Sequence, residues 1–185
     1  RSTMIDGLRF RGAHGDGTTN GVALRLRRAR ATINNCVFES NHSDAFGAAI
    51  WAQGDSLTLQ FCRFFYQTAG NRGGALYSNV RNLEVDRCEF QHNTALGASA
   101  VYVTGAQDAN FLGCLFANNS SLDVTNTFGG ALHADNVNFV RVQACTFSRN
   151  EAHQNSPVLQ TAAALTFQSV PNPSATGNIF WRNRV

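Results

Sequence analysis

The feature that most constrains this chain is a repeat in which a cysteine stands two residues before a phenylalanine. All five cysteines follow it, with three intervals of 26 residues and one of 31. A period of this length is typical of a solenoid, in which each repeat is a structural unit that buries its apolar face against its neighbours. The cysteines are Cys36, Cys62, Cys88, Cys114 and Cys145, and the phenylalanines of this register are Phe10, Phe38, Phe64, Phe90, Phe116, Phe147 and Phe180.

Two further patterns recur in phase with the cysteines. Apolar residues alternate before them, as at Leu57 and Leu59 or Leu83 and Val85, which is the period of a β-strand. Segments of small residues that end in an aliphatic residue also recur. Three short strands per repeat, without helical spacing, predict an all-β parallel β-helix of about seven coils and one domain over residues 1–185. The aliphatic residues form an expected core column: Leu24, Ile50, Leu76, Val101, Leu132 and Leu165.

The repeats carry two short motifs that point to a known class. The first is a Gly-Gly-Ala-aliphatic segment, at residues 73–76 and 129–132. The second is Phe-x-x-Asn, which begins at Phe38, Phe90, Phe116, Phe147 and Phe180. This pairing resembles the repeats of chlamydial polymorphic outer-membrane proteins, within the right-handed parallel β-helix class that includes pectate-lyase-like enzymes. The resemblance implies the handedness and an adhesive passenger domain in a larger assembly, extracellular or at the cell surface.

The repeated residues have physical reasons of their own. Equivalent side chains of successive coils lie about 4.8 Å apart, so the phenylalanines are expected to stack. The asparagine of each Phe-x-x-Asn motif suits a corner, where its amide bonds backbone groups, and we expect Gln67 to fit that corner less well. The cysteines are expected to pack as small buried hydrophobes. Their odd number and lack of close pairs argue against disulfides, a metal site or a nucleophile, and we expect no cofactor.

Charge is concentrated at one end of the chain. All fifteen basic residues are arginines, and residues 1–30 hold seven of them against two acids, for a net charge of +5. Arginine forks suit carboxylate, sulfate and phosphate groups, so a cluster of four is a candidate docking patch for an anionic polymer or an acidic partner; a solvated coil edge is the alternative. Nucleic acid binding is not expected, because no recognised module is present. The cluster consists of Arg25, Arg27, Arg28 and Arg30.

Strand parity places one aromatic column on the outer face of the solenoid. If Leu76 points inward, Tyr77 points outward, and its equivalents in neighbouring coils are Trp51, Tyr102 and His133. These four residues are the candidate site for a glycan or protein partner. The alternative is that aromatics are there as good strand formers. Beside the column we expect a flat row of alanines, and two long loops, at residues 120–128 and 151–161, border it.

Catalytic residues are not evident. Glycosidases and lyases of such folds need converging acids, and the densest group here, Glu84, Asp86 and Glu89, has no acidic equivalents in adjacent coils. The five histidines give no expected pair, and Asp55 is expected to pair with Arg81. The chain is therefore expected to be a non-catalytic structural or adhesive module. The alternatives are a polysaccharide lyase or glycoside hydrolase with catalytic residues outside this segment, and an architectural spacer.

The ends of the solenoid raise a separate expectation. No run of 18 apolar residues exists, so no transmembrane helix is predicted. Open solenoid ends expose unpaired strand edges. We therefore expect a segment of a longer chain or assembly, with its ends capped by flanking sequence or another chain, and a protein subunit or polysaccharide as partner.

Overall fold

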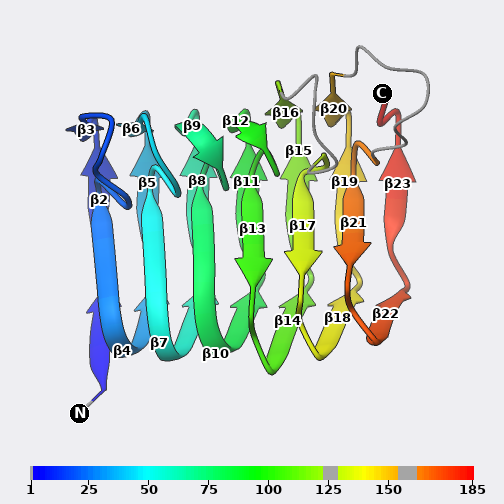
Figure 1. The fold of residues 1–185 in the computed structure, drawn as a ribbon, viewed down its shortest axis with the longest axis horizontal. Helices are drawn as coiled ribbons and strands as arrows, with labels where there is room; N and C mark the ends of the chain where they lie inside the picture. The colour runs from blue at the N-terminus through cyan, green and yellow to red at the C-terminus, as the bar shows by residue number, and fades with distance from the viewer. Residues whose placement is uncertain (1, 123–128, 154–161) are drawn as a thin grey trace.

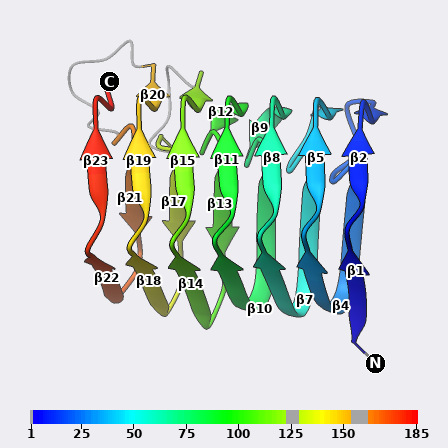
Figure 2. The ribbon, with the colours of Figure 1, turned by 180° about the vertical axis from the view of Figure 1, so that it is seen from behind.

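The computed structural model describes residues 2–122, 129–153 and 162–185. All regular elements in these residues are β-strands, and they form seven coils stacked from the N-terminus to the C-terminus (Figure 1; Figure 2). Equivalent strands of neighbouring coils pair in parallel, which produces three sheets. The register is kept along most of each pair and shifts at residues 27–30 and 95–97. The expected all-β parallel β-helix of about seven coils is confirmed.

Sheet A is the widest of the three sheets, and its strands bend. In three coils one strand of 11 residues crosses the bend, and in the last three coils two shorter strands replace it. Gly105 and Asn136 stand at the break with positive φ, a conformation that glycine and asparagine tolerate. The strands are β1 (Thr3–Asp6), β4 (Leu24–Asn34), β7 (Ile50–Gln60), β10 (Leu76–Asp86), β13 (Val101–Thr104), β14 (Asp108–Leu112), β17 (Leu132–Asp135), β18 (Phe139–Gln143), β21 (Leu165–Gln168) and β22 (Asn172–Thr176).

Sheets B and C complete each coil with shorter strands. Sheet B contains β2 (Arg9–Arg11), β5 (Val37–Glu39), β8 (Arg63–Phe65), β11 (Glu89–Gln91), β15 (Leu115–Ala117), β19 (Thr146–Ser148) and β23 (Ile179–Trp181). Sheet C contains β3 (His14–Gly15), β6 (His42–Ser43), β9 (Thr68–Arg72), β12 (Thr94–Gly97), β16 (Ser120–Ser121) and β20 (Glu151–Ala152). A sharp corner separates the two sheets.

Phenylalanines of sheet B form the predicted core ladder. Their rings stack with centroids 4.7 to 5.1 Å apart along the whole solenoid. Burying one such ring contributes about 2–3 kcal/mol. The aliphatic column of sheet A, from Leu24 to Leu165, is also in register. The predicted surface row of alanines is wrong, because Ala49, Ala75 and Ala100 are fully buried in the same core.

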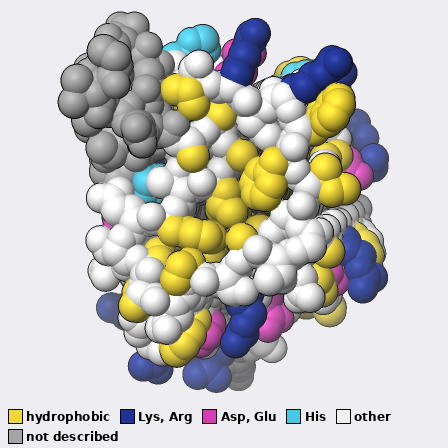
Figure 3. All heavy atoms as spheres, turned by 90° about the vertical axis from the view of Figure 1, so that its right-hand side faces the viewer, with side chains coloured by type: hydrophobic (Ala, Val, Ile, Leu, Met, Phe, Trp, Pro, Cys, Tyr) yellow, Lys and Arg dark blue, Asp and Glu magenta, His cyan; other side chains and the backbone are white. Residues whose placement is uncertain are grey.

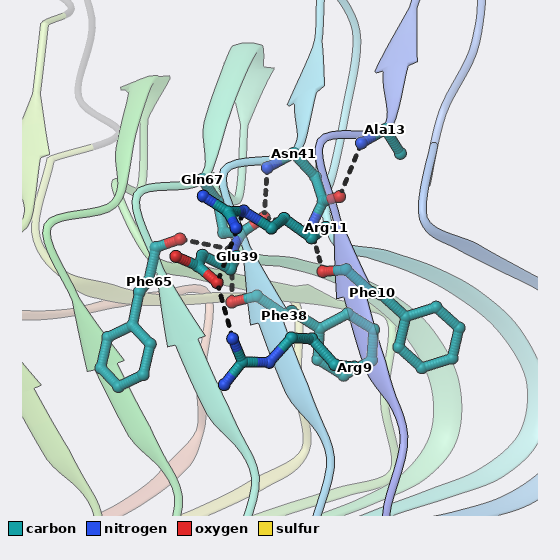
Figure 4. A network of polar contacts seen from close by, with 9 residues as sticks. All are labelled: Arg9, Phe10, Arg11, Ala13, Phe38, Glu39, Asn41, Phe65 and Gln67. Carbon is teal, nitrogen blue, oxygen red and sulfur yellow. Dashed lines mark hydrogen bonds and ion pairs between the residues drawn. The ribbon is translucent and has the colours of Figure 1, made fainter.

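Asparagines at the corner between sheets B and C form a second ladder, inside the solenoid. The Asn93 side-chain oxygen accepts the backbone N–H of Gln67, while its Nδ2 donates to the Phe64 carbonyl. Gln67 takes the same place, and its Oε1 accepts the backbone N–H of Asn41 at 3.2 Å (Figure 4). The expectation that Gln67 fits poorly is wrong: its longer side chain is fully buried, and its Nε2 also donates to the Phe65 carbonyl at 2.7 Å.

All five cysteines are buried and unpaired, as predicted for packing residues. Each thiol lies near the carbonyl of the residue two positions before it, as for Cys62 and Gln60 at 3.3 Å. In the last coil Asn178 replaces the cysteine. Its side-chain oxygen accepts the backbone N–H of Cys145 at 2.8 Å, so a polar side chain continues the ladder.

A histidine pair on sheet C contradicts the sequence analysis, which expected none. His14 and His42 are register partners, and their rings stack with centroids 4.8 Å apart. The first interval between core phenylalanines, Phe10 to Phe38, is 28 residues rather than 26, which hid the equivalence of the two positions. The His42 Nε2 also lies 2.9 Å from a carboxylate oxygen of Asp44.

The last coil presents apolar side chains at the C-terminal end of the solenoid. Figure 3 shows this end, where hydrophobic side chains gather at the centre of the face. Ile179, Phe180 and Trp181 are 60%, 52% and 55% exposed. The expectation that flanking sequence or another chain caps this end stays a prediction.

Within the described residues, no helix is long and apolar enough to span a bilayer.

Candidate functional site

The aromatic column lies where strand parity placed it. On sheet A, Trp51 pairs with Tyr77, Tyr77 with Tyr102, and Tyr102 with His133. The rings stack along the solenoid axis with centroid separations of 6.5, 5.4 and 5.4 Å. The predicted register is therefore confirmed, while a binding role for these residues stays a prediction.

Half of the aromatic column is not on the surface. Tyr102 is 2% exposed and His133 is fully buried, so the expectation of a uniformly exposed aromatic face is wrong. Chain segments that lead into sheet A cover the column. The Arg72 guanidinium lies 5.1 Å from the centroid of the Tyr102 ring, and the ring centroids of Phe46 and Tyr77 are 5.0 Å apart at an interplanar angle of 62°. Only Trp51 and Tyr77 keep partial exposure.

Burial also changes the ionisation of the covered residues. Desolvation lowers the pKa of His133 to about 4, although nearby Asp135 partly opposes the effect. Desolvation and a hydrogen bond to Asp135, at 2.9 Å, raise the pKa of Tyr102 to about 12. Both side chains are therefore neutral near pH 7, and His133 supplies no positive charge to a ligand.

The stacking leaves few ring faces open. Tyr77 lies between Trp51 and Tyr102, with interplanar angles of 7° and 23°, so each of its faces is turned toward another ring. The Arg25 guanidinium lies 5.2 Å from the centroid of the Trp51 ring. A sugar that stacks on an aromatic side chain needs a free ring face. The stacking within the column therefore favours contact with a sugar through the ring edges of Trp51 and Tyr77.

A polar groove follows the bend of sheet A, beside the aromatic column. Two adjoining cavities of about 450 and 430 Å³ form it, and both are lined by Gly54 and Asn79. Its walls come from five successive coils, which span about 19 Å in four steps of about 4.8 Å. We call it the sheet A groove. Its lining residues are Arg27, Arg28, Gln53, Gly54, Asp55, Asn79, Arg81, Gly105, Ala106, Gln107, Asn136 and Asn138.

Amides and guanidinium groups give the sheet A groove its chemistry. Gln53, Asn79 and Gln107 are exposed, and each amide can both donate and accept hydrogen bonds. Asn138 donates to the Gln107 side-chain oxygen at 2.9 Å, which orients that pair. Exposed Arg81 adds a positive charge beside the amides. The groove can therefore hydrogen-bond a ligand rich in hydroxyl groups along its length.

The predicted arginine patch divides into several roles. Arg27 and Arg28 are exposed and line the N-terminal end of the sheet A groove. Arg25 covers Trp51 instead. Arg30 donates from Nε to Asp55 at 2.9 Å, so the expected pairing of Asp55 with Arg81 is wrong. Docking by the patch stays a prediction that now concerns chiefly Arg27 and Arg28.

Comparison with known families adds the class of the protein. A family described as "Right handed beta helix region" matches residues 3–185. The chain belongs to the right-handed β-helix family. No curated protein and no solved structure matches this β-helix. The comparisons therefore establish the family and the right-handed coil, and the resemblance to chlamydial repeats stays a prediction.

The acids of this β-helix lie as the sequence register predicted. Glu84 pairs with Thr58 and Asn110, and Asp86 pairs with Gln60 and Leu112. Glu84 and Asp86 line a hollow of about 400 Å³ on the other limb of sheet A. Neither residue has an acidic equivalent in an adjacent coil. Within residues 2–122, 129–153 and 162–185, no three metal-ligating side chains are close enough to share an ion.

Sequence reasoning missed the amides of the sheet A groove. Gln53 and Asn79 lie two residues beyond Trp51 and Tyr77, so the same strand parity places them on the same outer face. Counting two residues further along each repeat would have found them. Of the predicted loops at residues 120–128 and 151–161, the structure describes residues 120–122 and 151–153, which include β16 and β20. The other residues of these loops lie outside the described part of the β-helix.

Proposed function

We propose that this β-helix is a non-catalytic module that binds a linear polysaccharide in the sheet A groove. One observation carries the proposal: a continuous polar groove follows the solenoid axis across five coils, beside the aromatic column. A parallel solenoid repeats the same outer position every coil, so it suits a polymer whose units repeat along a line.

The kinds of side chain in the groove favour a saccharide. Gln53 and Asn79 offer donors and acceptors to hydroxyl groups from adjacent coils, while Arg27 and Arg28 can meet acidic groups at one end. Partly exposed Trp51 and Tyr77 form an apolar wall that can contact sugar C–H groups through ring edges. The binding surface is therefore the sheet A groove with partly exposed Trp51 and Tyr77 beside it, rather than the whole aromatic column.

The test is a titration of the chain with neutral and acidic polysaccharides, in which tryptophan fluorescence and newly formed chain ends are followed together. Trp51→Phe identifies the fluorescence of the groove, because the other tryptophan, Trp181, lies in the last coil. We expect binding without cleavage. Cleavage would establish an enzyme instead, and the absence of binding to any polysaccharide would favour a protein partner or an architectural role.

Substitutions locate the binding surface. Gln53→Ala and Asn79→Ala should each weaken binding about ten-fold, because each removes hydrogen bonds to the ligand. Gln143→Ala is the matched control, since this amide is exposed on the other limb of sheet A. Equal affinities in all three variants would exclude the groove as the site.

A further inference from the structure

A second groove lies at the corner between sheets B and C, over the last four coils. Its volume is about 540 Å³. One wall consists of residues that follow the sheet B strands and have positive φ, among them His92, Asn118, Arg149 and Arg182. Residues of this corner groove lie beside β12 and residues of the sheet A groove lie beside β14. Figure 1 shows these two strands at opposite edges of the coils.

The corner groove carries excess positive charge. Arg184 forms an ion pair with Glu151, the one acid among the described lining residues, so that carboxylate already has a partner. The Arg149 side chain makes no ion pair or hydrogen bond with any described residue. The Arg182 guanidinium lies 5.2 Å from the centroid of the Trp181 ring. It forms no ion pair with a carboxylate of any described residue.

Arg149 and Arg182 thus stand side by side, and neither forms an ion pair with a described residue. Arg149 and Arg182 occupy equivalent positions of adjacent coils, as the hydrogen bond from the Arg149 backbone N–H to the Trp181 carbonyl shows. Their backbones are about 4.8 Å apart, so their charges repel each other. An oxyanion between two guanidinium groups would relieve this repulsion and accept several charge-assisted hydrogen bonds.

We propose that the corner groove binds an acidic saccharide, whose carboxylate or sulfate group lies between Arg149 and Arg182. The volume of about 540 Å³ is much larger than a single oxyanion requires. The remaining lining supplies neutral partners for hydroxyl groups, from Asn118 and Ser120, together with the ring of His92. This site shares no residue with the sheet A groove, and it goes beyond the function proposed for that groove.

Calorimetry on the whole chain tests the site, with an oligogalacturonate as the acidic probe and a cello-oligosaccharide as the neutral one. Arg149→Gln and Arg182→Gln should each weaken binding of the acidic probe about ten-fold, since each removes charged hydrogen bonds. Arg141→Gln should leave it unchanged, because this exposed arginine of the same coil as Arg149 lies on sheet A. Sulfate at constant ionic strength should compete with the probe.

An independent readout uses the wild-type protein, so it does not depend on how the variants fold. The Nε–H signals of Arg149 and Arg182 should shift when the oligogalacturonate binds, and that of Arg141 should stay in place. Equal affinity in Arg149→Gln, or an equal loss in Arg141→Gln, would overturn the proposal. Binding of sulfate without binding of either saccharide would also overturn it. Substitutions of Gln53 and Asn79 change the sheet A groove and leave the corner groove intact. The proposal for each groove can therefore be contradicted without affecting the other.

Discussion

The side-chain oxygen of Gln67 accepts both the backbone N–H and the side-chain amide of Asn41, at 3.2 and 3.0 Å. Asparagines make the same two bonds elsewhere in the ladder, as Asn119 does to Asn93 at 3.0 Å. A buried amide with all its bonds made stabilises the fold, and one left without partners is costly. The corner ladder therefore tolerates one extra methylene as long as the amide is kept.

Replacing Gln67 tests this equivalence. Gln67→Ala should lower the free energy of unfolding by about 3 kcal/mol, because buried donors and acceptors lose their partners. Gln67→Asn should cost less than about 1 kcal/mol, since it restores the residue of the other coils and loses only the bond to Phe65. Chemical denaturation measures both. Equal losses of unfolding free energy in the two variants would show that the side-chain amide does not stabilise the corner ladder.

The phenylalanine ladder makes a second prediction about stability. Phe90 stacks on Phe64 and Phe116 with centroids 4.8 and 4.9 Å away. Phe90→Ala should therefore cost about 3–5 kcal/mol, from lost burial and a cavity that the stacked coils cannot close. Phe139→Ala is the control, because Phe139 is 40% exposed and should lose less than about 1 kcal/mol. A small loss for Phe90→Ala would contradict the stacked core.

Buried His133 should make stability depend on pH. Its pKa of about 4 in the folded chain lies below the usual value of about 6.5, so the unfolded chain binds more protons between these values. The contribution of His133 to the free energy of unfolding is fully present above about pH 6.5 and is lost as the pH falls. The loss is about 2.5 kcal/mol between pH 7 and 4.5.

Urea denaturation at the two pH values measures the effect. His133→Gln should reduce the loss on acidification by that amount. If the wild type and His133→Gln lost stability equally on acidification, His133 would not be held neutral by burial.

The cysteines predict a chemical property of the folded chain. Burial raises the pKa of the Cys36 thiol, and a hydrogen bond with Cys145 together with burial raises that of Cys114. All five thiols are also buried, so they should resist a thiol reagent at neutral pH and react once the chain is unfolded. Counting modified cysteines by mass spectrometry checks this. Rapid modification of Cys62, Cys88 or Cys114 in the folded protein would contradict the buried column.

The sequence was sufficient for the fold because the repeat fixes which residues are neighbours. Once Phe64, Phe90 and Phe116 are taken as equivalent, the sheet B strands fall into register, and Trp51 aligns with Tyr77 on sheet A. The shift at residues 95–97 of sheet C is not visible in that count. The histidine pair was missed where the interval changed. Counting from Phe10 and Phe38 instead of from the cysteines would have aligned the two histidines.

Burial of the aromatic column could not be predicted in the same way. Strand parity states which face a side chain is on, and it does not state what covers that face. Tyr102 is covered by Arg72, which comes from the end of β9, where the repeats differ in length and sequence. The same limit hid the sheet A groove, since a cavity depends on the backbone bend as well as on the residues beside it.

The most direct test of the proposed function is to map a bound saccharide on the structure. A polysaccharide fragment that binds should be titrated into the isotopically labelled chain, and backbone amide shifts should be followed by NMR. We predict that the shifts cluster at residues 53–55, 79–81 and 105–107, in the sheet A groove. Shifts confined to other surfaces, with these three segments unchanged, would contradict the account.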